Sequence, residues 1–190
     1  MSDAPAIIGP TDLVELSRAF SFAAERHAAQ RRKGEAKEPY VNHLAEVAWL
    51  VAYATGGHDP ALVIAALLHD TVEDTPTTVA ELEAEFGADV AGLVSEVTDD
   101  KGKPKGERKR LQVENAPHKS ERARLIKIAD KTSNLRGLTT SPPADWDVAR
   151  KREYFEWAAQ VVEGCRGVNP WLEDTFDQAH RDGLSALGAE

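Results

Sequence analysis

The chain has 190 residues, and 42% of them are hydrophobic, which is enough for one compact domain with a full-sized core. The formal net charge of −9 argues against a general nucleic-acid binder, because such proteins need a basic face to neutralise phosphates. No run of 18 or more apolar residues is present, so no membrane-spanning helix is expected.

The termini and the cysteine content indicate the compartment. The N-terminal stretch MSDAPAIIGP has neither a basic region nor a long apolar region, so no secretory signal is predicted. The single cysteine, Cys165, excludes an internal disulfide and a zinc–thiolate site, and we interpret it as a small buried hydrophobe. We therefore expect a cytoplasmic protein with a flexible segment at residues 1–10. The oligomeric state stays open.

Helix-start signals begin near the N-terminus. Asp12, with Glu15 three residues later, predicts an amphipathic helix that runs to about Arg32. Asn42 predicts the cap of a second helix, which extends through Ala54 to a pair of glycines.

The signals continue through the middle of the chain. Asp59 followed by Pro60 predicts the start of a helix that Pro76 ends. Thr78 and Glu81 form a capping box for the next helix. Further helices are predicted over residues 88–98, 107–116, 120–136 (ended by Gly137), 144–164 and 170–187.

Helical periodicity dominates the whole sequence. There is no sustained alternation of apolar and polar residues, no Asn-Gly hairpin and no internal repeat. The segment EPYVN would add at most a minor β-ribbon near residues 33–42, and the aromatic residues of EYFEWAAQVV and PWLEDTFDQA are interpreted as core. The prediction is an all-α fold: a single compact helical bundle over residues 1–190, with its core at about residues 11–187.

One apolar helix carries an unusual density of acid. The segment AALLHDTVEDT places an imidazole and three carboxylates within six positions, at His69, Asp70, Glu73 and Asp74. At about 100° per residue, these groups share one side of the predicted helix. Carboxylates this close repel one another unless they are protonated or bridged by a cation. The segment therefore predicts either a metal site or a solvated surface.

Two other segments offer possible ligands. His43 lies in YVNHLAEVAWLV and, taken alone, is more typical of a cap or a surface residue. Asp130 interrupts the apolar segment LIKIADKTSNLR, where a charge must be paired or metal-bound. Lys127 is an alternative partner for Asp130, whereas Asn134 shares its face and could be an amide that faces a ligand.

Taken together, three helices offer two imidazoles and two carboxylates. This set suits a divalent ion such as Mn²⁺, Fe²⁺ or Zn²⁺, with open positions for water and a phosphate oxygen. Glu73 and Asp74 would lie beside the ion, where a general base or acid is needed. The ligand candidates are His43, His69, Asp70 and Asp130.

The basic residues are clustered although the protein is acidic. QRRKGEAK (30–37) and KGKPKGERKR (101–110) are dense in lysine and arginine. Each cluster is either solvated loop charge or part of a site for a small polyanion such as a nucleotide.

Six segments together resemble the stand-alone small alarmone hydrolases of the RelA/SpoT-homologue group, within the HD phosphohydrolase superfamily. The segments are RRKGEAKEPYVNHLAEVA, AALLHDTVEDT, VTDDK, ERKRLQVE, LIKIADKTSNLR and EYFEWAAQVV. They follow the family's order and cover roughly residues 15–175. The resemblance implies an all-α, usually Mn²⁺-dependent enzyme with one ion per chain, which removes the 3′-pyrophosphate from ppGpp-type alarmones.

The resemblance also implies residue roles. His43, His69, Asp70 and Asp130 would be the metal ligands, and Glu73 with Asp74 would orient and activate the attacking water. The substrate would contact Arg32, Lys33 and Asn134, with Lys105 and Arg150 placed near its 5′-phosphates.

Two departures from the family pattern stand next to these residues. Leu44 replaces a common proline, which predicts a change in how the helix of His43 starts. Thr132 and Ser133 replace a bulkier pair, which predicts a change in the shape of the substrate pocket. Other functions that remain open are hydrolysis of adenosine (ppApp-type) alarmones, NADPH phosphatase activity at the same metal site, and a non-catalytic nucleotide sensor.

Overall fold

The computed structural model describes residues 9–188 as a bundle of α-helices, which confirms the all-α prediction. Residues 1–8 of the predicted flexible segment lie outside the described residues. No helix in the described range is long and apolar enough to cross a membrane. The elements are α1 (Pro10–Arg26), α2 (Val41–Ala54), α3 (Pro60–Leu68), α4 (Thr71–Asp74), α5 (Val79–Val97), α6 (Lys105–Asn115), the 3₁₀ helix η1 (Ala116–His118), α7 (Glu121–Thr140), α8 (Val148–Glu163) and α9 (Pro170–Gly188).

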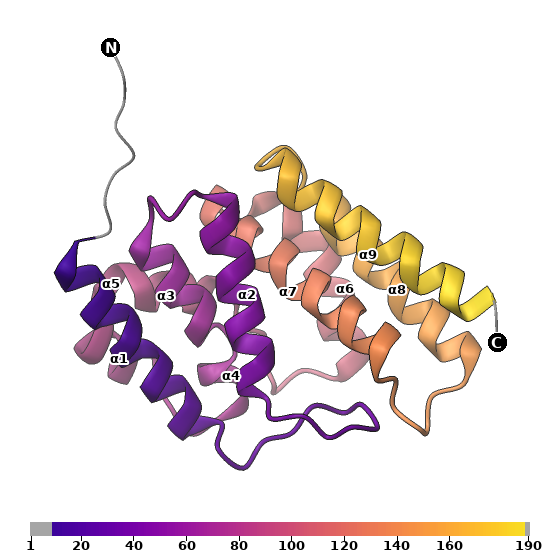
Figure 1. Ribbon diagram of the computed structural model, residues 1–190, viewed down its shortest axis with the longest axis horizontal. Coiled ribbons are helices and arrows are strands. Elements are labelled where there is room, and N and C mark those ends of the chain that lie inside the picture. The colour runs from indigo at the N-terminus through magenta and orange to yellow at the C-terminus, as the bar shows by residue number, and fades with distance from the viewer. Residues whose placement is uncertain (1–8, 189–190) are drawn as a thin grey trace.

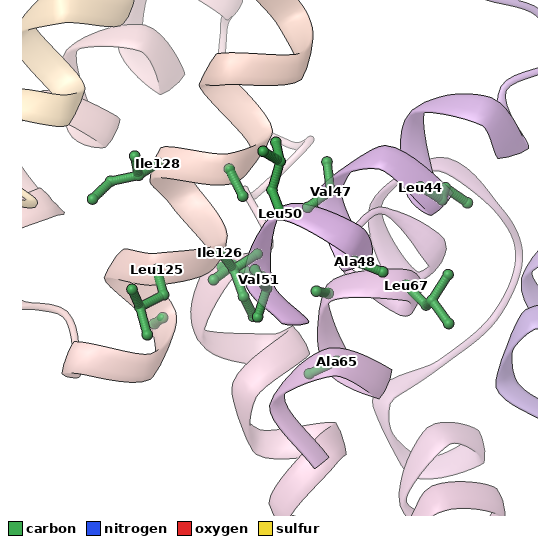
Figure 2. Close-up of a cluster of buried hydrophobic side chains, with 14 of the residues drawn as sticks. Leu44, Val47, Ala48, Leu50, Val51, Ala65, Leu67, Leu125, Ile126 and Ile128 are labelled. Atoms are coloured by element: carbon green, nitrogen blue, oxygen red, sulfur yellow. The ribbon is translucent and has the colours of Figure 1, made fainter. Parts of the chain in front are cut away.

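Helices α2 and α7 form the centre of the bundle. Figure 1 shows α1, α3 and α5 at one end and α8 and α9 at the other, with α2 and α7 between them. The helix α2 packs on both α3 and α7, and α7 packs on α9. Figure 2 shows the core at these contacts, which includes the fully buried Val51 of α2, Ala65 of α3 and Ile126 of α7. The candidate ligands thus lie on, or directly after, helices that pack in the core.

Two of the local capping signals were predicted correctly. Asp59 accepts a hydrogen bond from the backbone N of Leu62 (3.0 Å), and Thr78 accepts one from that of Glu81 (3.1 Å). Each such cap stabilises a helix by about 1 kcal/mol. Gly87 has φ 84° and joins two helical segments within α5, as the sequence-based division at residues 87–88 suggests.

The first helix ends at Arg26, and the prediction that it continues to about Arg32 is wrong. Beyond it, the chain forms an isolated antiparallel bridge between Arg31 and Pro39, and the backbone N of Arg32 donates to the carbonyl of Glu38 (2.9 Å). These non-local bonds pair backbone N–H and C=O groups that a longer helix would pair within itself. The bridge is the minor β-structure expected in this region.

The helix predicted from Pro60 to Pro76 is broken at His69 and Asp70, which separate α3 from α4. The imidazole of His69 bonds through Nδ1 to the carbonyl of Ala66 (2.8 Å), a group that the next helical turn would otherwise use. Polar groups on the two sides of the break therefore do not share one helical face.

Other helix boundaries also differ from the predictions. The residue that precedes α2 is Tyr40, and Asn42 lies inside the first turn, where its backbone N bonds to the carbonyl of Pro39 (3.1 Å). The helix α8 begins at Val148 instead of residue 144, because Asp147 supplies its cap.

Glycines let the α1–α2 loop dock against the end of α7. A Cβ on Gly34 would lie 2.1 Å from the carbonyl oxygen of Ser141. Gly137 does not end α7 as predicted, and a Cβ there would lie 2.7 Å from Nη2 of Arg32. The lack of side chains at these two positions brings the basic segment that follows α1 against α7.

The single cysteine is structural. Cys165 is free and fully buried, as predicted, and burial raises the pKa of its thiol to about 11.

Candidate active site

Three buried side chains from distant segments converge at the centre of the bundle. His43 of α2, His69 between α3 and α4, and Asp130 of α7 offer ligand atoms that all lie within 4.8 Å of one another. Asp70, the fourth predicted ligand, places Oδ2 3.1 Å from Nε2 of His69 and 3.6 Å from Nε2 of His43. The structure thus brings all four predicted ligands together.

Both imidazoles are oriented by a hydrogen bond at Nδ1. Nδ1 of His69 donates to the carbonyl of Ala66 (2.8 Å). Nδ1 of His43 lies 2.9 Å from Oγ of Ser133, and this hydroxyl donates to Glu46 (2.6 Å). Both Nε2 atoms are buried and make no hydrogen bond within residues 9–188. With its proton on Nδ1, each neutral imidazole presents a lone pair at Nε2, where a metal ion would take the place of a second proton.

The charges at this centre call for a cation. Burial lowers the pKa of His69, but Asp70 and Asp130 outweigh that effect and raise it to about 10. Burial raises the pKa of both carboxyls, yet the facing imidazoles, and Lys131 beside Asp130, hold both values well below the usual range. Two carboxylates this strongly ionised, with side chains only 19% (Asp70) and 11% (Asp130) exposed, need a proton or a metal ion between them.

The spacing of the candidate ligand atoms fits a divalent ion. The separations between imidazole Nε2 and carboxylate oxygen atoms run from 3.1 to 3.8 Å. Ligands held about 2.0–2.2 Å from a common ion lie roughly 3–3.5 Å apart, and mixed imidazole and carboxylate sets bind several divalent metals. The residues present therefore fit a divalent metal.

Lys131, not Lys127, is the lysine that pairs with Asp130. The Nζ of Lys131 lies 2.9 Å from Oδ2 of Asp130, whereas Oδ1 accepts from Nδ2 of Asn134 (2.6 Å) and lies 3.4 Å from Nε2 of His43. Lys127 is also buried, and burial lowers its pKa. The sequence contained the signal for Lys131, since it is a second cation next to an acid in an apolar helix.

Glu73 and Asp74 belong to α4. They lie beside the candidate metal centre, the site formed by the four predicted ligands, but they contact different partners. One carboxylate oxygen of Glu73 accepts from the backbone N of Asp99 (3.2 Å) and the other lies 3.4 Å from Nη1 of Arg108. Burial and the charge of Asp70 raise the pKa of Glu73. Glu73 is thus better suited than an exposed carboxylate to hold a proton.

A cavity of about 580 Å³ lies beside the metal centre. Tyr40 and Asn134 line it and connect it to the centre, because the Tyr40 hydroxyl donates to Asp70 (2.6 Å) and Asn134 bonds to Asp130. All five residues that were predicted to contact substrate line the cavity: Arg32, Lys33, Lys105, Asn134 and Arg150.

Positive charge dominates the cavity wall, although the whole chain carries −9. Six of its lining residues are Lys or Arg and three are Asp or Glu. Burial lowers the pKa of Lys105, and the nearby charges of Lys33, Arg150 and Lys109 lower it further. Such mutual repulsion between cations is relieved when an anion binds.

Sequence comparison places these features in a family. Residues 19–155, which include every candidate ligand, match the HD domain family. The chain belongs to the HD domain family. Its guanosine-3′,5′-bis(diphosphate) 3′-pyrophosphohydrolase relatives, called MESH1, include the Xenopus tropicalis protein, 51% identical over 90% of this chain and 96% of the relative. The Homo sapiens protein is 53% identical over 87% of this chain and 93% of its own length.

A solved structure with a similar sequence has the same fold. It is described as a metazoan ortholog of SpoT that hydrolyzes ppGpp and plays a role in starvation responses. It is 46% identical in sequence and aligns with a TM-score of 0.85 over 88% of this chain and 94% of its own.

Several contacts of this HD domain were not predicted. Gln30 lines the cavity and donates to Asp74 (2.8 Å), a cavity residue that also pairs with Lys101. Tyr154, interpreted as core, lines the cavity wall, as does Trp146. These residues carry no local signal, because their position depends on contacts with distant segments.

The departures from the family pattern are not among the residues that line the cavity. Thr132 and Ser133 are buried and neither lines the cavity, so a change in its shape through these two residues stays a prediction. Ser133 instead contacts His43. Leu44 is fully buried in the core, and α2 starts three residues before it.

We expect Asp130→Asn to lose the bound divalent metal, because the change removes an anionic ligand from a buried set. Elemental analysis after dialysis measures this loss. Asp89→Asn, which removes an exposed carboxylate paired with Arg122 (2.7 Å), should keep the metal content of the wild type. Full occupancy in Asp130→Asn would contradict the ligand assignment.

Proposed function

We propose that the protein is a divalent-metal-dependent pyrophosphohydrolase that removes the 3′-pyrophosphate from ppGpp-type alarmones. The observation that carries this proposal is the shared boundary of two sites. Tyr40 and Asn134 each touch both a candidate metal ligand and a cavity lined by cations. The activity named for relatives that align over nearly their whole length supports the same reaction.

We assign the metal to the four convergent ligands, and Mn²⁺ is the ion proposed. Two imidazoles and two carboxylates form a mixed set that accepts Mn²⁺ and leaves positions open. A divalent ion held there would polarise a phosphoryl oxygen and make a nearby water more acidic. The assigned ligands are His43, His69, Asp70 and Asp130.

The acid pair of α4 would handle the proton of the attacking water. Glu73 is held by the backbone N of Asp99 and has a raised pKa, so it can accept a proton and keep its orientation. Asp74 faces the cavity and is fixed by Gln30, which suits it to position the nucleophile.

The cavity cations would bind the substrate. Arg32 and Lys33 belong to the loop that docks on α7, so they meet the nucleotide next to Asn134. Lys105 and Arg150 lie within one electrostatic neighbourhood and would bind the 5′-diphosphate. Offsetting the substrate's charge is essential in an acidic protein, which otherwise repels polyanions.

The direct test is a substrate panel. Metal-free protein, protein loaded with Mn²⁺ and the Asp130→Asn variant are each incubated with ppGpp, ppApp or NADPH, and the products are separated by anion exchange. We expect the loaded protein to convert ppGpp into GDP and pyrophosphate, and excess EDTA to abolish the reaction. The proposal would be refuted if the loaded protein left ppGpp intact. Faster turnover of ppApp or NADPH would show that this compound, and not ppGpp, is the preferred substrate.

Glu73→Gln should retain Mn²⁺ and substrate affinity but lower kcat by about 10²–10⁴-fold, because an amide cannot take a proton from water. The amide oxygen can still accept from the backbone N of Asp99, so little rearrangement is expected. Metal analysis, substrate binding and kcat separate the possible roles. Loss of metal would show that Glu73 is a ligand. A kcat near that of the wild type would show that Glu73 takes no part in the proton transfer.

Lys105→Ala should lower kcat/KM for ppGpp. The loss of transition-state stabilisation should be about 1.5–3 kcal/mol, the range for a hydrogen bond to a charged group. The loss should shrink at high salt, which screens the contact. Lys103→Ala is the matched control, because this lysine pairs with Glu107 (3.1 Å) and does not line the cavity. Equal effects of both substitutions would show that only general surface charge matters.

A further inference from the structure

The two imidazoles of the metal centre are held by different kinds of support. His69 bonds to a backbone carbonyl, which no side-chain substitution can remove. His43 depends on a chain of side chains, in which its Nδ1 lies 2.9 Å from Oγ of Ser133 and that hydroxyl lies 2.6 Å from Oε2 of Glu46. The other oxygen of Glu46 lies 2.9 Å from Nη1 of Arg136.

The chemistry of these groups fixes the direction of every hydrogen bond. An ionised carboxylate only accepts, so the single hydroxyl proton of Ser133 must point to Glu46. Ser133 therefore accepts from His43, whose Nδ1 carries the ring proton. The other ring nitrogen is left with its lone pair, which faces Oδ1 of Asp130 at 3.4 Å.

The relay joins two packed helices and leads from the core toward the surface. His43 and Glu46 are three residues apart on α2, and Ser133 and Arg136 are three apart on α7, so each pair shares one helical face. Ser133 is 1% exposed, whereas the side chain of Glu46 is 31% exposed. The charge of Glu46 thus acts on the centre through one buried hydroxyl.

We propose that Glu46 is a positioning residue of the metal centre and that it acts on His43 through Ser133. A carboxylate that accepts from the hydroxyl polarises it, which strengthens the bond from His43 and makes the imidazole a better electron-pair donor. The relay also holds the ring in the tautomer that a metal requires. This inference rests on the metal centre of the proposed function and does not depend on the identity of the substrate.

The test measures metal affinity without catalysis. Metal-free wild type, Glu46→Gln, Ser133→Ala and the double variant are titrated with Mn²⁺ by calorimetry and with Co²⁺ by visible absorption. Each single variant should bind Mn²⁺ about 10–100-fold more weakly, as is usual for groups that orient a ligand. The double variant should lose little more affinity for Mn²⁺ than the single variant that binds it more weakly, because both changes interrupt one relay. The Co²⁺ absorption band should shift in each.

A matched control separates this role from a change in net charge. Glu81→Gln also removes a glutamate paired with an arginine, and the side chain of Glu81 has similar exposure (35%). It should bind Mn²⁺ as the wild type does. Thermal unfolding of each metal-free variant confirms that the fold is intact.

A second control tests whether Glu46 only ties α2 to α7. Arg136→Gln breaks the ion pair but leaves the bond between Ser133 and Glu46, so it should lower the unfolding temperature and keep the affinity for Mn²⁺. An equal loss of affinity in Arg136→Gln, or wild-type affinity in both Glu46→Gln and Ser133→Ala, would overturn the proposal. A wild type that binds neither ion would instead refute the metal centre itself.

Discussion

Electron pairs that converge in a buried space are the constraint on which the rest of this structure depends. Two imidazole nitrogens lie 3.1 to 3.8 Å from the oxygens of two carboxylates, where little water can screen the charges. In that setting, the centre must hold a proton or a metal ion. Its ligands lie on or next to α2, α3 and α7, and close packing of those helices fixes the distances between the ligand atoms. The apolar core is thus also the frame of the chemical site.

Charge is distributed in two opposite ways across a short distance. The centre gathers acids and imidazoles, whereas the neighbouring cavity gathers cations, although the protein as a whole is acidic. This arrangement suits a reaction in which a metal and a polyanion must meet, because each region attracts one of them. The docked loop at Gly34 is what joins the regions, since it brings Arg32 next to Asn134.

Much of the fold and the membership of the site could be predicted, because their signals are local or match a known motif order. Caps such as Asp59 and Thr78 act within three residues, and the four ligands stand in a recognisable sequence pattern. The break at His69 could not be predicted, since it depends on where a side chain finds a backbone partner. The contact of His43 with Ser133 spans 90 residues, and no helical period encodes such a pair.

The amide of Asn134 has both of its ends engaged, and this has a thermodynamic consequence. Its nitrogen donates to Asp130 at the metal centre, and its oxygen accepts from Arg32 in the cavity (3.0 Å). A single rigid group that belongs to two sites makes their occupancies interdependent. Whatever free energy the first ligand gains by holding this amide in place, the second ligand gains by the same amount, whichever of them arrives first.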